Sequence, residues 1–374
     1  MPLANDTLFL KPSLTDQKDW KTNRKCMIIN AFWPHLQLAE QDYIEEDYTA
    51  FFDFLGRTLQ NLSPHVSKFA AQEWEGLFSI VTSLNTNRAM PRKEITEDIK
   101  KGFLNIGEPA ISRSVELALR LWLGVNVCSK GSSVGPRNPR DGRTDWRDDQ
   151  SLDEMIMGLF QPDPIEAISP SIGFDESFTV VNIKNICRLR VRWTDNLSDH
   201  LRLEGPRGQR CLSIYRHKLG LVNHMKGPKP HIIPTEVLDE AIRTLDLLFP
   251  FGDPKTEAFL DEEMIRFWMI APLESPRSAK LGEFKYWRSN LVQLLKLYNG
   301  PPGTVIQTLF DTRNISQFAT LWVAIFGVFF LTIMFGVIST VYSIKQYQIS
   351  LKAYELALAQ ACQQIDRPLP AFCN

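Results

Sequence analysis

The sequence has no cysteine cluster and no surplus of charge of one sign. Its six cysteines are scattered over 374 residues without a CxxC pair. This argues against a disulfide scaffold or a zinc ribbon and suits a reducing compartment for the large N-terminal part. The formal net charge is −1, so no nucleic-acid partner is expected. The N-terminal residues MPLANDTLFLKPS lack a basic segment followed by an apolar run, and we expect no signal peptide there.

Motifs of known catalytic and cofactor sites are also missing. There is no G-x-S-x-G, and the GPPG at 300–303 lacks the Lys and Ser or Thr of a phosphate-binding loop. The histidines between 200 and 231 do not form the two tight ligand pairs that zinc prefers. Asp195 and Asp199 fit turns and caps better than a general acid and base. We therefore assign no catalytic, cofactor-binding or metal-binding residue, and no cofactor.

The chain does contain one long apolar segment near its C-terminus. Residues 314–344 include no charged side chain, and 318–344 are almost wholly apolar. A membrane-spanning helix needs about 20 mostly apolar residues to cross the hydrocarbon layer. A buried core helix of a soluble protein is usually shorter and carries some polar residues. We therefore predict a single transmembrane helix at residues 316–344 and the lipid bilayer as a partner.

The ends of this segment carry side chains that suit the membrane interfaces. Trp322 and Tyr342 are separated along a helix by about 30 Å, which matches the hydrocarbon thickness. Arg313 lies before the segment and Lys345 after it, and both can extend toward the headgroups. These four residues are the predicted interface anchors.

A heptad pattern of apolar residues follows the predicted span and ends before Pro368. The pattern predicts that the helix continues into a tail at 345–374. The span and this tail could self-associate, or the tail could lie on the headgroups or pack on the protein's own domain. The residues predicted for self-association are Ile344, Tyr347, Leu351, Tyr354, Leu358 and Ile365.

The remainder divides by composition into three regions. Residues 1–128 are predicted mainly helical, with apolar periodicity at 42–59, 67–84, 96–104 and 112–127. Residues 129–150 are rich in Gly, Pro, Ser, Arg and Asp and are predicted to be a flexible linker. Residues 151–315 are predicted to be an α+β region that begins at a capping box formed by Ser151 and Glu154.

Strand-like patterns occur only within the α+β region. Residues 178–183 and 186–193 look like strands, and 200–203 and 211–215 flank a Gly- and Pro-containing loop that fits a hairpin. Helical patterns return at 236–248, 256–269 and 284–298. The predicted fold class is therefore mainly α with a small antiparallel β region (α+β), followed by one C-terminal transmembrane helix that continues into a tail helix.

A basic stretch accompanies the predicted strands. Residues 184–218 contain nine Lys and Arg against three acidic residues. Arg188, Arg190 and Arg192 alternate and would share one strand face. Such a face could bind anionic lipid headgroups, or it could be a solvated face paired with acids elsewhere.

Residues 150–374 resemble an uncharacterised family of single-pass membrane proteins from filamentous fungi. The resemblance rests on WTDNL at 193–197, DHL at 199–201, IYRH at 214–217, LLFP at 247–250, YWR at 286–288, and residues 307–314 and 345–373. The family has no assigned activity. The resemblance therefore implies a membrane anchor and a fungal origin but no chemistry.

The orientation of the span follows from a balance of two features. Lys345 and Lys352 slightly favour a cytosolic tail, but that would require about 310 residues to cross the membrane without a signal peptide. We expect the large N-terminal part to be cytosolic, with Cys362 and Cys373 able to pair in an oxidising lumen. The expected function is a membrane-tethered interaction or scaffold module, and the alternative is a membrane-anchored enzyme whose site the sequence does not reveal.

Overall fold

The chain forms two units, Met1–Gly300 and Pro301–Asn374, which are considered separately. The structure, a computed structural model, describes residues 20–129, 142–164, 172–206, 209–267, 280–300 and 315–363. Its described part is mainly helical, with a small sheet and one long apolar C-terminal helix. The predicted predominance of helix is therefore confirmed.

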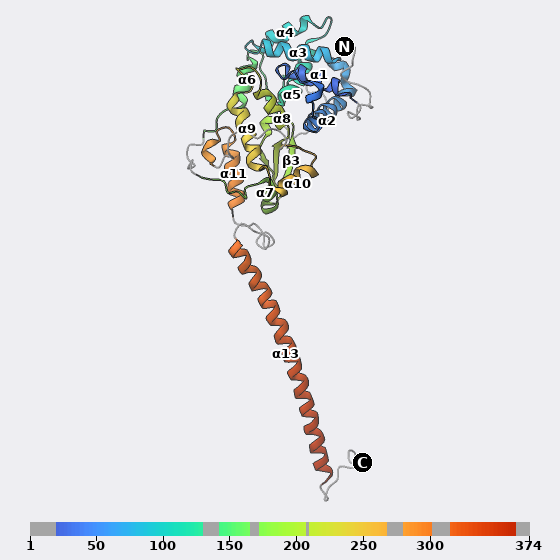
Figure 1. The fold of residues 1–374 in the computed structure, drawn as a ribbon, viewed down its shortest axis with the longest axis vertical. Helices are drawn as coiled ribbons and strands as arrows, with labels where there is room; N and C mark the ends of the chain where they lie inside the picture. The colour runs from blue at the N-terminus through green and yellow to red at the C-terminus, as the bar shows by residue number, and fades with distance from the viewer. Residues whose placement is uncertain are drawn as a thin grey trace. The chain divides into compact units, whose positions relative to one another are not determined.

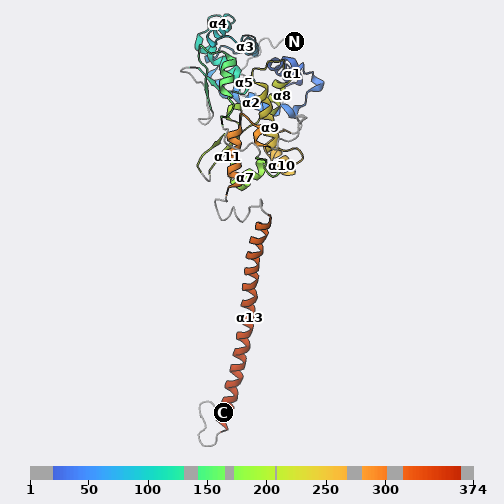
Figure 2. The ribbon, with the colours of Figure 1, turned by 90° about the vertical axis from the view of Figure 1, so that its left-hand side faces the viewer.

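The first part of the larger unit is helical, as predicted (Figure 1). Its α-helices are α1 Thr22–Phe32, α2 Glu45–Leu62, α3 Trp74–Thr86, α4 Arg92–Lys101 and α5 Glu108–Leu123, with short 3₁₀ helices at Pro34–Leu36, Glu40–Asp42 and Ser63–Lys68. Helix α5 packs against α3 and α4, and the three lie side by side in Figures 1 and 2. The apolar periodicity located α2, α4 and α5 to within about four residues, but it began α3 at residue 67 although the helix starts at Trp74. It did not distinguish α1 as a separate helix.

Helix α2 shows why these segments are helical. Acidic side chains occupy its first turn, where they complement the positive end of the helix dipole. Its apolar side chains recur every three to four residues and are buried on one face. These are Tyr48, Phe51, Phe52, Leu55, Leu59 and Leu62.

The rest of the larger unit mixes short strands with helices. In chain order the elements are β1 Val127–Cys128, β2 Thr144–Asp145, α6 Leu152–Leu159, α7 Val180–Cys187, β3 Arg190–Thr194, a 3₁₀ helix Leu197–Asp199, β4 Leu203–Glu204, β5 Cys211–Tyr215, α8 Lys218–Met225, α9 Thr235–Leu248, α10 Pro254–Glu262, a 3₁₀ helix Leu281–Glu283 and α11 Arg288–Asn299. The predicted capping box is present, because the Ser151 hydroxyl accepts from the Glu154 N–H and the Glu154 carboxylate accepts from the Ser151 N–H. Helix α8 packs against both α2 and α9.

The three-stranded sheet differs from the antiparallel sheet that was predicted. Its order is β3-β5-β4, with β3 and β5 parallel and only β4 and β5 antiparallel. The hairpin between β4 and β5 matches the prediction and turns at Gly205, whose φ is +94°. Strand β5 lies between β3 and β4, so β3 pairs with the second hairpin strand and not with the first, and these two strands run parallel.

The predicted strand at 178–183 is wrong. Thr179 accepts a hydrogen bond from the Asn182 N–H and caps α7, so the β-branched residues that follow are helical. Arg188 ends α7 with a left-handed backbone (φ 51°), and β3 begins only at Arg190. A local capping interaction has outweighed the β propensity of this segment.

Residues 142–150 are attached to the larger unit by a strand pair, a buried indole and an ion pair, which a flexible linker would not be. Strand β2 pairs in parallel with β1. Trp146 is 1% exposed, and its indole N–H donates to the Gln150 carbonyl at 2.9 Å. Arg92 pairs with Asp148 at 2.8 Å. The predicted linker is therefore wrong over these residues, and its remainder, 130–141, lies outside the described residues.

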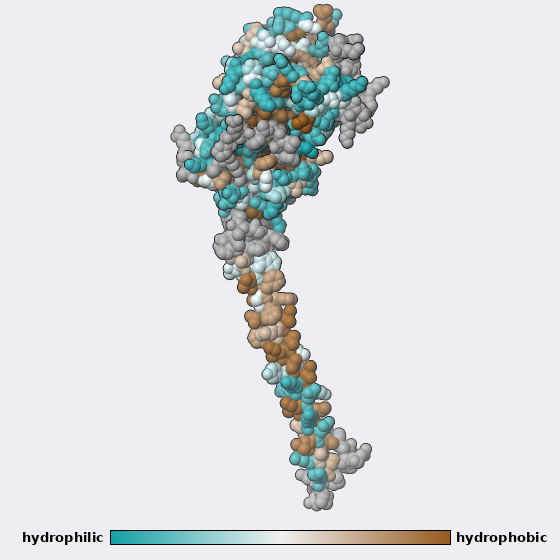
Figure 3. Space-filling model, viewed as in Figure 1, coloured by the Kyte–Doolittle hydropathy of each residue, from teal (hydrophilic) through white to brown (hydrophobic). Residues whose placement is uncertain are grey.

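The smaller unit contains α13, Ile315–Cys362, a helix of 48 residues. Within the described residues, the stretch Trp322–Cys362 is the one helix long and apolar enough to cross a membrane, and it has a peak mean hydropathy of 2.3. Large apolar side chains such as Phe329 (63%) and Phe330 (68%) are exposed along it. Figure 3 shows an apolar band on α13 that gives way to mixed polarity toward its C-terminal end. This composition suggests membrane association.

Candidate functional site

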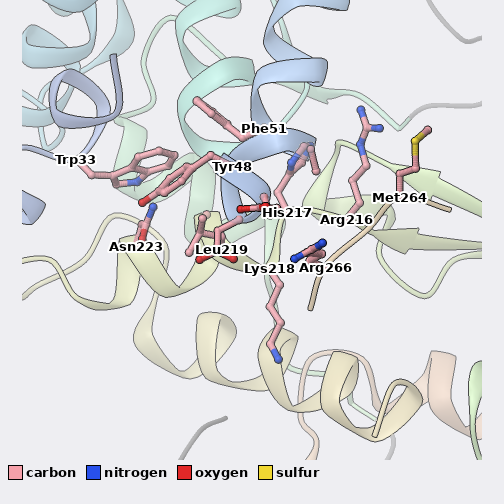
Figure 4. Close-up of a pocket in the computed structure, with 14 residues that line it drawn as sticks. Trp33, Tyr48, Phe51, Arg216, His217, Lys218, Leu219, Asn223, Met264 and Arg266 are labelled. Carbon is pink, nitrogen blue, oxygen red and sulfur yellow. The ribbon is translucent and has the colours of Figure 1, made fainter. Parts of the chain in front are cut away.

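A cleft in the larger unit brings together residues that are far apart in the sequence (Figure 4). It is narrow, and the space inside it that a water-sized molecule can reach is about 20 Å³. Its walls come from the end of α1, the first turns of α2, the segment from β5 into α8, and the residues after α10. It is lined by Trp33, Glu46, Asp47, Tyr48, Ala50, Phe51, Arg216, His217, Lys218, Leu219, Gly220, Asn223, Met264 and Arg266.

The parallel pairing of β3 and β5 places an ionic cluster at the edge of this cleft. Thr194 is opposite Tyr215 at the end of both strands, so the residues that follow emerge at the same edge of the sheet. The Asp195 carboxylate oxygen Oδ1 accepts from Arg216 Nε at 2.5 Å and from His217 Nε2 at 2.7 Å. Arg216 and His217 line the cleft, and Asp195 orients both.

The protonation states in this cluster follow from burial and charge. Burial alone would raise the pKa of Asp195, but the hydrogen bonds and charges of His217 and Arg216 outweigh it and hold the pKa well below its usual range. Burial lowers the pKa of His217, although Asp195 opposes this change. With a neutral imidazole, donation to Asp195 assigns the proton to Nε2 and leaves Nδ1 as a bare acceptor.

Several buried polar atoms that line the cleft have no hydrogen-bond partner within the described part of the chain. They are Trp33 Nε1, Asp47 Oδ1, Arg216 Nη2, His217 Nδ1 and Asn223 Nδ2. Burial raises the pKa of Tyr48, and the neighbouring Asn223 amide opposes this rise. These atoms are the groups that a small polar molecule such as water would contact in the cleft.

Lys218 lines the cleft but its ammonium group is used elsewhere. Its Nζ donates to Asp246 at 2.5 Å and to the Phe267 carbonyl at 3.2 Å. In Figure 4 its side chain extends away from the other labelled side chains. Lys218 therefore contributes its backbone and aliphatic stem to the wall and no free charge.

The other polar residues considered from the sequence have structural roles. The Asp199 carboxylate accepts from the Gly142 N–H, Asn196 Nδ2 and Arg202 Nη1. Burial lowers the pKa of His200 to about 3, so its ring is neutral and links Thr244 to the Tyr215 N–H. No group of side chains suited to a metal ion occurs among the described residues.

The three arginines proposed for lipid binding do not form one strand face. Arg188 lies outside β3, at the left-handed end of α7, while Arg190 is its exposed first residue. Arg192 donates to Ser213 Oγ at 2.7 Å and lies 3.8 Å from Glu204. The shared face is therefore wrong for Arg188, because the chain turns there before the strand begins.

The predicted membrane residues that are described all lie on α13. Trp322 stacks on Phe326 with ring centroids 5.4 Å apart, and Tyr342 is 69% exposed. Lys345 lies within the helix, which continues beyond the predicted span end. Arg313 and Ile365 lie outside the described residues. The predicted association residues Ile344, Tyr347, Leu351, Tyr354 and Leu358 are on this helix, and the first four of these are between 46% and 69% exposed.

Sequence reasoning singled out Asp195 and His217 separately but missed the cleft. The available signal was the position of WTD and YRH at the ends of two strand-like segments, which becomes informative only once the strands are known to be parallel. Trp33 and Asn223 gave no signal, since each is an ordinary core residue in its own segment.

Comparison with known protein families, with curated proteins and with solved structures finds no match to this chain.

Proposed function

We propose that this chain is a single-pass membrane protein whose larger unit is an interaction module held at the bilayer. The observation that carries the proposal is the apolar stretch Trp322–Cys362 with its exposed aromatic and aliphatic side chains. Water is a poor solvent for such a surface, and hydrocarbon is a good one. Trp322, Tyr342 and Lys345 would anchor the helix at the interfaces.

The larger unit faces the cytosol in this proposal, and the state of its cysteines supports that side. Cys26 and Cys211 are free, whereas Cys362 at the end of α13 is disulfide-bonded. This difference fits a reducing compartment for the unit and an oxidising one for the helix end. Asn196-Leu197-Ser198 matches the sequence pattern of an N-glycosylation site. This gives no contrary indication, because Asn196 is 1% exposed and its side chain donates a hydrogen bond to Asp199.

Self-association would proceed through the part of α13 beyond the interface residues. Ile344, Leu351 and Leu358 repeat every seven residues, and Tyr347 and Tyr354 occupy the intervening positions of the seam. Of the two arginines on β3, only Arg190 is proposed to bind anionic lipid headgroups. The guanidinium of Arg192 already donates to Ser213 and lies beside Glu204. Neither function requires an enzyme activity.

Membrane insertion and orientation are tested together on sealed membranes. A tag is placed before Met1 and another after Asn374. One portion of the sealed membranes is treated with protease, and a separate portion is extracted with alkaline carbonate. The proposal expects the protein to stay with the membranes and only the C-terminal tag to be protected. Release by carbonate would refute the span, and protection of only the N-terminal tag would refute the orientation.

A membrane-anchored enzyme is the second candidate, and the observation that favours it is His217. Its Nδ1 is a buried acceptor in a cleft, and Asp195 fixes its tautomer, which is the arrangement of a general base. No Ser, Thr or Cys is among the described residues that line the cleft, so the base would act on water or on the bound molecule itself. Hydrolysis of p-nitrophenyl esters that is lost in His217→Gln and retained in Trp122→Phe would support this candidate over a binding module.

A further inference from the structure

We propose that the larger unit docks on anionic lipid headgroups through a basic edge, a cluster of four cations: Lys184, Arg188, Arg190 and Arg210. The inference rests on the proposed membrane anchor and extends the single lipid contact of Arg190 to a surface. It is carried by the position of the four cations, by the counter-ions around them, and by the place where the chain leaves this unit. The cytosolic leaflet carries the negative surface potential of a membrane, which agrees with the proposed orientation.

Helix α7 and the parallel strands β3 and β5 bring these cations to one edge of the sheet. Arg190 begins β3, and its N–H donates to the carbonyl of Arg210 at 2.9 Å, one residue before β5 begins. Parallel strands begin at the same edge of a sheet, so these two residues are neighbours there. Arg188 joins them from the end of α7, and its N–H donates to the carbonyl of Lys184 one turn earlier. The cleft lies beyond the opposite edge, where both strands end.

The basic edge has no counter-ion among the described side chains. Arg188 and Arg190 are exposed, and the other two cations are half-buried. None of the four forms an ion pair with a carboxylate that the structure describes. The Lys184 ammonium lies 4.7 Å from the centroid of the Phe259 ring, a contact that leaves its charge in place. Four such charges attract a negatively charged surface although the whole chain has a net charge of −1.

The acidic side chains of β4 and of the end of α10 are directed elsewhere. Glu204, on β4, forms an ion pair with Arg202 at 2.6 Å. Glu263, just after α10, accepts from the indole N–H of Trp193 near the end of β3 at 2.9 Å. Asp261 lines a groove together with residues of α2. The acids of α10 therefore lie toward the cleft end of the sheet, and the positive charge stays concentrated at the basic edge.

The basic edge lies at the end of the larger unit where the chain leaves it. The Tyr298 hydroxyl, in the last turn of α11, lies 2.7 Å from the Ser177 hydroxyl just before α7, and α11 packs on α7. In both views α7 and the C-terminal end of α11 lie at one end of this unit and α4 at the other (Figures 1 and 2). The unit ends at Gly300 and α13 begins at Ile315. A short connection to a span gives the unit a high effective concentration at the headgroups, so individually weak contacts are sufficient.

The test measures binding of the full chain, held in nanodiscs of phosphatidylcholine, to separate sucrose-loaded vesicles that sediment. The discs keep α13 in a neutral bilayer and leave the larger unit free to reach the vesicles. The vesicles contain phosphatidylcholine alone or mixed with phosphatidylserine, and empty discs give the background. Arg188→Gln combined with Arg190→Gln removes the two exposed charges of the basic edge. Lys93→Gln combined with Lys100→Gln is the matched control, since it removes two exposed charges from α4 at the other end of the unit.

We expect the wild type to sediment with the phosphatidylserine vesicles and not with the neutral ones, and less so as the salt concentration rises. Each basic side chain near an anionic surface strengthens binding by about fivefold, so the basic-edge variant should bind roughly twenty- to thirtyfold more weakly. The control should stay within about twofold of the wild type, because charges farther away than a Debye length are screened. Near-UV circular dichroism should show that both variants are folded.

Three results would overturn the proposal. The first is that the wild type sediments no better with phosphatidylserine vesicles than with neutral ones. The second is that the control loses as much binding as the basic-edge variant, which would assign the attraction to net charge. The third is that poly(U) RNA binds the wild type more tightly than the vesicles do at equal phosphate concentration, which would point to a nucleic-acid partner. A chain that does not enter the discs would refute the span instead, and its binding to the vesicles is then measured without discs.

Discussion

Replacing Asp195 by Asn should destabilise the larger unit by about 2–3 kcal/mol. Removing one partner of a buried ion pair costs about 3–5 kcal/mol, whereas an exposed pair contributes about 0–1 kcal/mol. The Asp195 side chain is 29% exposed while that of Arg216 is 13% exposed, so the expected cost lies between these limits. The loss arises because the Arg216 guanidinium stays largely buried without its counter-charge.

The comparison is made by urea unfolding of the full chain in detergent at pH 7, followed by tryptophan fluorescence. Asp239→Asn is the control, since Asp239 forms a more exposed pair with Arg243 on one helix and should lose less than about 1 kcal/mol. Equal losses in the two variants would refute the argument that burial makes the Asp195 cluster different.

The pH dependence gives an independent check of the same reasoning. The pKa of Asp195 is lowered on folding, so its contribution to stability is complete above the ordinary value of 3.8 and is lost as pH falls toward the folded pKa. The difference between wild type and Asp195→Asn should therefore stay constant from pH 7 to 5 and shrink below about pH 4. A difference that shrinks already at pH 6 would contradict the assigned pKa direction.

Three further predictions concern the core. The carboxylate of Glu240, which is 1% exposed, accepts three backbone N–H groups just before α11 at 2.6, 2.8 and 2.8 Å. In the same urea assay, Glu240→Gln should lower the free energy of unfolding by about 2 kcal/mol, and the control Glu236→Gln at an exposed position by less than about 0.5 kcal/mol. Gly252 has φ +79° and open space around it, so Gly252→Ala should destabilise the unit by about 1–2 kcal/mol through backbone strain alone. Gly124 has φ +63°, and a Cβ there would also meet a buried tyrosine hydroxyl, so Gly124→Ala should destabilise the unit more. Equal losses of stability would show that the tyrosine side chain moves aside. Burial lowers the pKa of His200 to about 3, so below about pH 6.5 the unfolded chain binds a proton that the folded chain does not. The urea midpoint of the wild type should therefore fall as the pH drops below about 6.5. The midpoint of His200→Asn should fall less over the same pH range, measured from its own value at pH 7.

Local patterns predicted much of the fold because many elements are specified by nearby residues. The capping box at Ser151 and the apolar stripes of α2 and α9 need only a few turns of sequence. Residues 178–183 failed under the same approach, since β-branched residues after Thr179 suit a strand or a capped helix. The β propensity of these residues and the capping side chain of Thr179 are both local signals, and the sequence does not show which of them is stronger.

The candidate site was predictable only in pieces. His217 was recognised as one of several histidines, and Asp195 as a residue at a strand end, but their hydrogen bond depends on the parallel register of β3 with β5. Parallel pairing is a long-range contact that hydrophobic alternation does not specify. Trp33 also lines the cleft, and it lies at the end of α1. In the sequence, more than half the length of the larger unit separates it from the sheet, so no spacing rule connects it with His217.

The placement of Trp146 has a consequence for how this chain can be divided. The Gly-, Pro- and Arg-rich composition after residue 129 suggests a domain boundary there. The C-terminal part of that segment nevertheless supplies the buried indole of Trp146 and the Asp148 partner of Arg92. A fragment that ended at residue 128 would have a hole in its interior and an arginine without its carboxylate. The segments before and after residue 129 share one interior, so neither should fold stably without the other.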